Sequence, residues 1–270
     1  MKGEKVMFKT NNVNSQTIFK FFLKKFLVGC FCACHTLAMN AEAFNEISHK
    51  YVTKTSFEAI TDLKSDDPPK KGLHEFSEFL KNDEQNYKEL LVEYSVQPDI
   101  DENQGIYKYH FYNPITEANF MNEKKSALTK CKSHFSKAIS FYNEGKKAEA
   151  YQQLGRSIHF MEDMNTPVHT AYDQPTDSLF KLPLHMDFEK VCDNVCAECK
   201  LEVVPEALNY YQDNSLDTIA NSAATLSADN FYYLENNKID KKTLAKNAIS
   251  NAQKKILGII YKFFLEISNK

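Results

Sequence analysis

The sequence predicts an all-α, single-domain protein. Apolar residues recur at helical spacing over long stretches of the 270 residues, and no alternating pattern typical of β-strands competes with them. Seven glycines and eight prolines are few for this length, which favours long regular elements over a turn-rich β fold. No Gly/Ser-rich or Pro-rich linker divides the chain, and its 43% hydrophobic content can supply one core.

The periodic segments define the expected helices in chain order. The first spans 51–63 and stops before Pro68-Pro69, and the second spans 73–92. Segment 98–114 is polar and turn-like, so we expect a loop there. Segments 127–142 and 147–164 predict a helical hairpin with its turn at 143–145, and Pro167 ends or kinks the second helix. Segments 185–200, 220–234 and 242–267 complete the bundle.

The first 43 residues have the pattern of a secretory signal. Three lysines at 20, 24 and 25 precede an uncharged run over 26–39, and Ala41-Glu42-Ala43 follows as a small-x-small cleavage site. The apolar run is shorter than the roughly 20 residues of a membrane span. We therefore expect a signal peptide at 1–43, a catalytic domain at 44–270, and export to the periplasm or outside the cell after cleavage near Ala43.

Cleavage there would change the charge and the cysteine count. Six lysines and two glutamates would leave, so the net charge would change from −3 to −7, which disfavours a nucleic-acid backbone as partner. Four cysteines would remain, namely Cys131, Cys192, Cys196 and Cys199. In an oxidising compartment we expect two disulfides with any of three pairings, and a structural zinc on the last three cysteines is the alternative.

Histidines and carboxylates at ligand spacing are the candidate chemistry. His159 and Asp163 stand four apart on a predicted helix, as do His185 and Glu189, so each pair projects from one helical face. His169 follows just after Pro167. Imidazole and carboxylate donors suit Zn²⁺. Each pair alone is common on solvated helices, but three such elements within 159–189 favour a metal site. His74 and His134 lack such partners and are assigned to the surface or to ordinary core.

Three segments resemble the bacterial zinc-dependent phospholipases C of the alpha-toxin type. Residues 154–169, LGRSIHFMEDMNTPVH, are similar to the family's signature of Leu-Gly, then HxxxD, then Asn-x-Pro-x-His. Residues 110–114, HFYNP, resemble its His-Phe-aromatic-Asp-Pro motif with Asn113 in place of the acid. His185-x-x-x-Glu189 is similar to its last ligand pair, and His49 lies five residues beyond Phe44, which stands where the family begins with Trp.

The resemblance implies a helical bundle with three zinc ions in a cleft. It assigns one ion to His110, His159 and Asp163. It assigns a second to His49 and the amino and carbonyl groups of Phe44, with Asp163 bridging the two. It assigns the third to His169, His185 and Glu189. Asp99 aligns with the catalytic carboxylate, and Asp101 is the alternative if the loop is shifted. Head-group contacts fall on Glu46, Ile100 and Tyr107.

The resemblance also implies the activity. It predicts a secreted, monomeric zinc phosphodiesterase that cleaves phospholipids at the glycerol-side phosphodiester bond, releasing diacylglycerol and the phosphorylated head group, with transient contact to a membrane surface and no nucleic-acid partner. A zinc-dependent single-strand nuclease is the alternative, because the short spacing between Phe44 and His49 in the sequence resembles that of the related nucleases.

Overall fold

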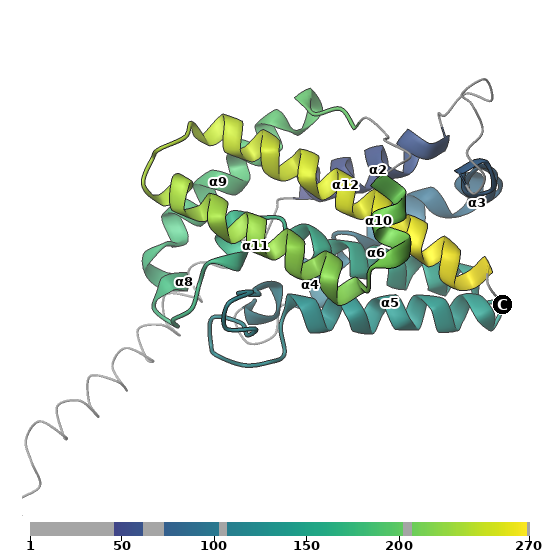
Figure 1. The fold of residues 1–270 in the computed structure, drawn as a ribbon, viewed down its shortest axis with the longest axis horizontal. Coiled ribbons are helices and arrows are strands. Elements are labelled where there is room, and N and C mark those ends of the chain that lie inside the picture. Colours follow the sequence, from purple (N-terminus) through teal and green to yellow (C-terminus); the bar gives the residue numbers. More distant parts are fainter. Residues whose placement is uncertain (1–45, 62–72, 103–106, 202–206, 269–270) are drawn as a thin grey trace, which may run out of the picture. The chain divides into compact units, whose positions relative to one another are not determined.

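The computed structural model describes residues 46–61, 73–102, 107–201 and 207–268 (Figure 1). The proposed signal at 1–43 and Phe44 lie outside these residues. In the described part of the chain one isolated β-bridge pairs Asn113 with Ala118, and the other regular elements are helices. The predicted all-α class is therefore confirmed.

Within the described residues, seven long helices build the fold. They are α2 (Glu46–Thr61), α3 (Leu73–Tyr94), α5 (Ala127–Asn143), α6 (Lys147–Asp163), α9 (Leu182–Val195), α11 (Leu216–Glu235) and α12 (Lys241–Ser268). Each corresponds to a helix expected from the periodicity, with ends that differ by a few residues. The hairpin of α5 and α6 turns at Gly145, whose positive φ of 78° suits glycine.

Short elements lie between the long helices, and the sequence did not predict them. They are α4 (Gln97–Asp101), η1 (Lys108–His110), α7 (Pro167–Thr170), α8 (Asp177–Phe180), η2 (Cys196–Glu198) and α10 (Leu208–Asp213). The expectation of a loop over 98–114 was therefore wrong at 98–101, which belongs to α4, and at 108–110, which forms η1. A helix of three to six residues holds too few positions for an apolar period to show.

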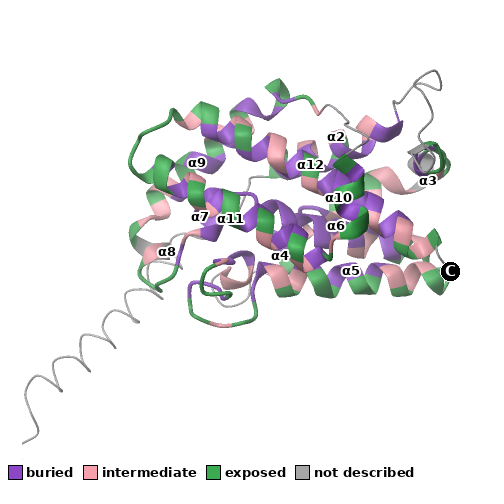
Figure 2. Ribbon diagram, viewed as in Figure 1, coloured by how far each residue is buried: buried purple, intermediate pink, exposed green. Residues whose placement is uncertain are grey.

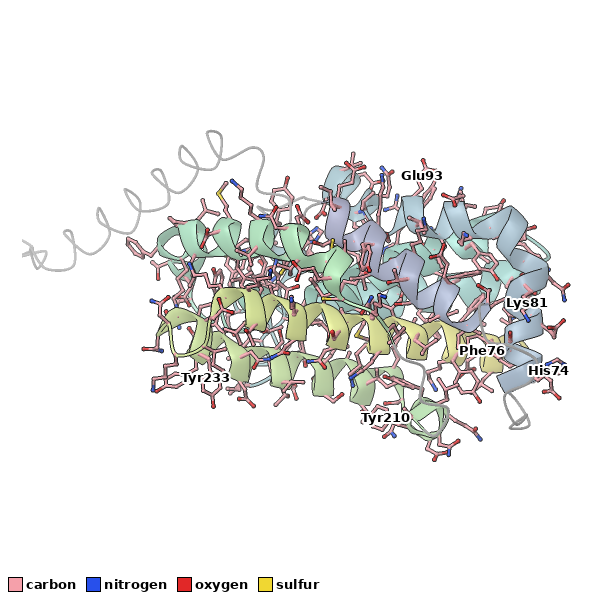
Figure 3. All side chains as sticks on the ribbon, turned by 90° about the horizontal axis from the view of Figure 1, so that it is seen from above. His74, Phe76, Lys81, Glu93, Tyr210 and Tyr233 are labelled. Atoms are coloured by element: carbon pink, nitrogen blue, oxygen red, sulfur yellow. The ribbon has the colours of Figure 1, made fainter. Side chains whose placement is uncertain are left out.

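The core lies where α12 passes between other helices. It packs against α2 and α9 and also against α11, as Figure 3 shows from above. Buried residues face inward along all of these helices (Figure 2). Phe57, Phe76 and Phe263 are among the largest fully buried side chains. By contrast, His74 is exposed near the start of α3, as expected for a surface residue (Figure 3).

Helices α3 and α6 approach each other unusually closely at Gly155. A Cβ atom at this position would lie 2.6 Å from the carbonyl oxygen of Leu91 and 2.9 Å from Cβ of Tyr94. Only glycine permits this crossing without a shift of the backbone. The crossing sets the end of α3, and with it Ser95, beside the next turn of α6.

The four cysteines of the described chain are free and buried. The expectation of two disulfides is wrong for this structure. Cys131 lies on α5 and contacts the Ser157 hydroxyl at 3.4 Å, whereas Cys192 lies on α9, Cys196 begins η2 and Cys199 directly follows η2. No cysteine belongs to a metal-ligating group among the described residues, so the alternative of a structural zinc gains no support. Among the same residues no helix is both long and apolar enough to cross a membrane.

Candidate metal centre

Eight buried histidines and carboxylates from six helical elements converge, each with 7% or less of its surface exposed. They are His49 on α2, Asp99 on α4, His110 on η1, His159 and Asp163 on α6, His169 on α7, and His185 and Glu189 on α9. Every predicted ligand in the described chain is thus in this cluster. Phe44 lies outside the described residues, so its ligation stays a prediction.

Potential ligand atoms in the cluster form three groups, each with its atoms within 4.8 Å of one another. The groups are His110, His159 and Asp163; His169, His185 and Glu189; and His49, Asp99 and His159. The first two correspond to sets expected from the sequence. The third adds Asp99 beside His49, which the sequence placed with Phe44 and Asp163. Bridging of two ions by Asp163 stays a prediction.

Helix geometry explains the two closest pairs. His159 Nε2 lies 3.4 Å from Asp163 Oδ2 along α6, and His185 Nε2 lies 2.6 Å from Glu189 Oε1 along α9. Residues four apart share a helical face, so each pair is set by the backbone. Pro167 then begins α7 after an extended Thr166, and this turn brings His169 Nε2 to 3.1 Å from Glu189 Oε1.

Hydrogen bonds to oxygen atoms that are not themselves candidate metal ligands fix the orientation of three imidazole rings. His159 Nδ1 donates to the carbonyl oxygen of Ser95 at 2.8 Å, and His169 Nδ1 donates to that of His110 at 3.0 Å. His49 Nδ1 contacts a carboxylate oxygen of Glu162. A neutral imidazole that donates from Nδ1 keeps its lone pair on Nε2, so each ring presents a ligand atom to the cluster.

Two buried polar atoms show that the residues fit a cation. His110 Nε2 and Asp163 Oδ1 are buried and make no hydrogen bond. His110 Nδ1 lies 2.9 Å from His159 Nε2 and 3.0 Å from Asp163 Oδ2. An all-protein arrangement would leave such atoms unsatisfied at a cost of roughly 1–3 kcal/mol each, whereas a metal ion would accept their lone pairs. Nitrogen and oxygen donors in sets of three are the ligands of zinc.

The pKa values of the buried groups agree with ligation. Burial, with the nearby charge of His169, lowers the pKa of His110 to about 3. Burial also lowers the pKa of His159 well below its usual value, and His110 adds to this. Both rings are therefore neutral near pH 7, which is the form that binds metal. Burial raises the pKa of Asp163 to about 8. A nearby cation would stabilise the ionised carboxylate in this buried position.

Asp99, rather than Asp101, faces the histidines. Its Oδ1 atom lies 3.5 Å from His110 Nδ1 and 3.5 Å from His159 Nε2. Asp101 instead forms a two-contact ion pair with Arg156, with distances of 2.5 and 2.7 Å, and it is 42% exposed. Both aspartates belong to α4, but only Asp99 projects toward the ligand cluster.

Glu162 is a buried residue of the centre that sequence reasoning missed. Its Oε2 atom contacts His49 Nδ1, and its Oε1 atom accepts a hydrogen bond of 3.0 Å from the Thr53 hydroxyl. Burial raises the pKa of Glu162 well above its usual value, an effect opposed by the Thr53 hydrogen bond. The available signal was a glutamate within the otherwise apolar and ligand-bearing turn 160–163 of α6.

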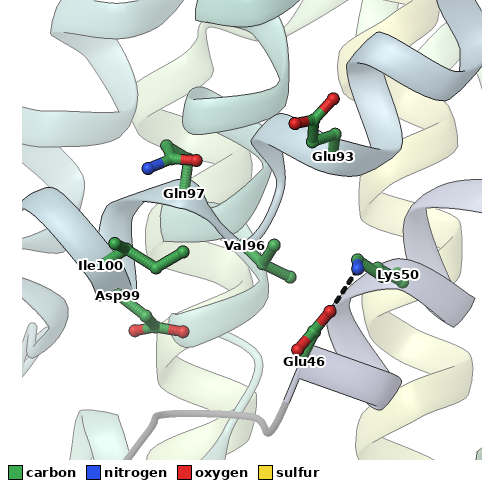
Figure 4. Close-up of a pocket in the computed structure, with 7 residues that line it drawn as sticks. All are labelled: Glu46, Lys50, Glu93, Val96, Gln97, Asp99 and Ile100. Carbon is green, nitrogen blue, oxygen red and sulfur yellow. Dashed lines mark hydrogen bonds and ion pairs between the residues drawn. The ribbon is translucent and has the colours of Figure 1, made fainter.

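A cavity of about 210 Å³ opens beside Asp99 (Figure 4). Its lining residues come from α2, α3, α4 and the turn between the last two, and are Glu46, Lys50, Glu93, Val96, Gln97, Asp99 and Ile100. Two of the three expected head-group contacts, Glu46 and Ile100, are therefore brought together next to Asp99. Tyr107 is not part of this lining. It lies beside His110, with 5.7 Å between the ring centres.

Comparisons with known proteins find phospholipases C as relatives of this chain. Curated phospholipases C match the chain, including one from Clostridium perfringens that is 27% identical over 231 residues, which is 77% of this chain and 56% of the relative. Another, from Listeria monocytogenes, is 25% identical over 143 residues, covering 52% of this chain and 47% of the relative. The chain spans about half the length of the curated relatives it matches.

Solved structures show the same fold. Alpha toxin from Clostridium absonum superposes with a TM-score of 0.68 at 23% identity, covering 85% of this chain and 65% of that one. An alpha-toxin from an avian strain of Clostridium perfringens gives a TM-score of 0.67 at 23% identity, with 84% and 65% covered. The family described as zinc dependent phospholipase C matches residues 48–248. Because this match spans well over half of the sequence, the chain belongs to the zinc-dependent phospholipase C family.

Proposed function

We propose that the protein is a zinc-dependent phospholipase C that hydrolyses the glycerol-side phosphodiester bond of phospholipids to diacylglycerol and a phosphorylated head group. The observation that carries the proposal is the convergence of seven other buried histidines and carboxylates with Asp99, in a chain that belongs to this family. The curated relatives it matches are phospholipases C.

We assign three zinc ions to the donor groups. One would be held by His110, His159 and Asp163, and another by His169, His185 and Glu189. The remaining ion would be held by His49 with the amino and carbonyl groups of Phe44 after signal cleavage, and Asp163 would bridge it to the first. When bound, the ions supply positive charge that polarises the phosphoryl group and activates the attacking water.

The chain's own side chains organise the reaction around these ions. Asp99 is buried and lies next to both the ligand cluster and the cavity, so its carboxylate orients the water and accepts its proton. Ser95, Glu162 and the His110 carbonyl hold the imidazoles of His159, His49 and His169 in fixed tautomers. The ligands therefore need little rearrangement when the substrate binds.

The cavity beside Asp99 is the proposed head-group site. The carboxylates of Glu46 and Glu93 line it with Asp99, against one lysine, Lys50, which pairs with Glu46. This balance favours a head group that carries a positive charge. The side chain of Ile100 supplies an apolar wall and is 64% exposed, so the cavity is accessible to a lipid.

The test is release of phosphorylated head group from a panel of phospholipids by the cleaved protein, with and without a zinc chelator. We expect chelator-sensitive release that is fastest for lipids with a cationic head group. Protein with full zinc content that releases nothing from any lipid would overturn the proposal, and single-stranded nucleic acid included in the panel would detect the nuclease activity considered from the sequence.

Export, the monomeric state and the absence of a nucleic-acid partner are part of the same proposal. Residues 1–43 carry the signal pattern, and the second zinc set needs a free amino group on Phe44. N-terminal sequencing of the protein secreted by its host tests export, and the mass of the protein in solution tests the monomeric state. An N-terminus other than Phe44 would remove the proposed backbone ligands.

A further inference from the structure

A second cavity, of about 450 Å³, lies along an exposed side of α5 and contains none of the metal ligands. Three lysines line it, Lys125, Lys130 and Lys137, together with the hydroxyl-bearing residues Thr129 and Ser133. Three of these side chains are cations, and the Ser133 hydroxyl adds a neutral donor, whereas the Thr129 hydroxyl already donates to the carbonyl oxygen of Ser126 at 2.8 Å. The cavity is therefore basic, although the chain as a whole has a net charge of −3.

Glu102 is the one carboxylate in the described lining of this cavity, and its charge is already shared among three partners. Its oxygens lie 2.5 Å from Lys130 Nζ, 2.7 Å from a guanidinium nitrogen of Arg156 and 3.0 Å from His134 Nε2. His134 is buried and also contacts Gln153 Oε1 at 2.8 Å. This network closes one wall of the cavity and leaves Glu102 unable to neutralise the remaining lysines.

Two of the three lysines have no acidic partner. Among the described residues, no carboxylate lies within 4.0 Å of the ammonium group of Lys125 or of Lys137. Lys125 is exposed next to the N-terminus of α5. The Nζ atom of Lys125 sits 4.4 Å from the ring centre of Tyr109. Lys108 and Lys130 lie 5.2 and 5.5 Å from the same ring centre. Lys108 is paired with Glu123 at 2.8 Å and Lys130 with Glu102 at 2.5 Å, so Lys125 is the ammonium group beside this ring that has no carboxylate partner among the described residues. A bound anion would supply that partner.

We propose that this cavity binds a phosphate group, through Lys125 and Lys137 with the hydroxyl of Ser133. Lys125 precedes α5, and Ser133 and Lys137 lie one turn apart on it, so ammonium and hydroxyl donors line the same cavity. Such donors suit the several oxygens of a phosphate, and lysine binds phosphate as a point charge. The phosphate comes either from a free phosphorylated molecule or from the head group of an anionic lipid. The site is separate from the metal centre and does not depend on the proposed function.

The cavity is placed to affect the segment that carries Asp99 and His110. Glu102 caps the end of α4, three residues after Asp99, and Tyr109 immediately precedes His110. Phosphate binding would hold the lysines of the cavity in place around Glu102 and Tyr109. The ligand therefore binds beside the catalytic cluster without touching it.

The absence of tryptophan from the sequence permits a direct test. Tyr109→Trp introduces the sole indole beneath the three lysines, and its emission is titrated with inorganic phosphate in the zinc-loaded protein. We expect a saturable change, and we expect Lys125→Gln with Lys137→Gln in the same background to weaken the midpoint by about tenfold or more, equivalent to roughly 1.4 kcal/mol. Lys124→Gln is the matched control, because Lys124 is exposed, adjacent in sequence and paired with Glu117 at 3.7 Å.

Vesicles distinguish the two sources of phosphate. A larger emission change with phosphatidylglycerol vesicles than with inorganic phosphate at equal phosphate concentration assigns the site to lipid head groups, and the reverse assigns it to free phosphate. Equilibrium dialysis of labelled phosphate into the zinc-loaded protein without the Tyr109 change provides a second measurement, in which the double lysine variant should lose one class of site. A response that is absent for both ligands, or that survives the double variant with the same midpoint and stoichiometry, overturns the proposal.

Discussion

The carbonyl oxygen of Ser95 accepts a hydrogen bond of 2.8 Å from Nδ1 of His159. Ser95 follows the last residue of α3, and His159 lies one turn after the glycine at which α6 crosses α3. The contact therefore links helix packing to the metal centre, since the ring is turned so that Nε2 faces the other ligands. Any change in the spacing of the two helices should alter the orientation of this imidazole.

Gly155→Ala tests that link. The added Cβ would meet the Leu91 carbonyl at 2.6 Å, so α3 and α6 must separate. We expect the free energy of unfolding to fall by about 1–3 kcal/mol, as for other overpacked cores, and zinc affinity to fall with it. Urea denaturation and zinc titration measure both effects. Gln152→Ala, on the same helix, is the control, and equal stability of the two variants would show that the crossing tolerates a methyl group.

How much of this could be read from the sequence depends on the length of each element. Long helices such as α6 and α12 show a full apolar period, and their positions were predicted. The ligands on them followed from four-residue spacing and from motif resemblance. Helix α4 has five residues, so its pattern could not be read, and only the structure separates Asp99 from Asp101.

Other parts of the centre leave little or no trace in a sequence. The carbonyl of Ser95 is a backbone group that every residue possesses, so only the fold can select it. Glu162 adjoins Asp163 but points about 100° away around the helix, toward α2, and its partner His49 is 113 residues distant. Tyr107 was expected at the head-group site, but its left-handed backbone, with φ of 56°, belongs to the turn before His110, outside the lining of that cavity.

Glu162→Gln should weaken zinc binding without removing a ligand. The neutral amide no longer stabilises the donating Nδ1–H of His49, so the imidazole becomes a poorer and less well oriented ligand. We expect a loss of about 10–100-fold in affinity for one zinc ion. Competition with a chelator measures it, and Glu198→Gln, an exposed change that affects only lysine pairs, is the control. Identical zinc affinities for Glu162→Gln and the native protein would exclude a positioning effect of Glu162 on His49.

Asp99→Asn and Asp101→Asn should differ sharply. Loss of the Asp99 carboxylate removes the group that orients and deprotonates water, so we expect kcat to fall by about 10²–10⁴-fold. Loss of the Asp101 carboxylate breaks its ion pair with Arg156. Because the Asp101 side chain is 42% exposed, the free energy of unfolding should change by less than about 1 kcal/mol. Head-group release assays decide between them, and a larger loss of kcat for Asp101→Asn would reverse the assignment.

Asp163→Asn should lower the zinc content by two ions per molecule. The carboxylate lies in the donor group of His110 and His159, and in the proposed assignment it would also bridge to the ion at His49. An amide has no negative charge to bridge two cations. Elemental analysis of the purified variant gives the stoichiometry, with Asp187→Asn, an exposed change on α9, as control. Unchanged zinc content and rate would remove the bridging assignment.

The ion-pair network of Glu102 should make stability depend on pH in the acid range. Burial raises the pKa of this carboxyl, but the hydrogen bonds and charges of His134 and Lys130 outweigh that effect and leave it far below its usual range. The folded state therefore binds a proton at Glu102 less readily than the unfolded state does. The stabilisation is fully present above the unfolded pKa, near 4.3, and is lost as the pH falls toward the folded pKa.

Glu102→Gln should thus unfold more easily than the native protein at pH 7, and the difference should shrink below about pH 4. Thermal unfolding of both proteins across this range measures it. A difference that stays constant with pH would mean that the glutamine costs packing rather than charge.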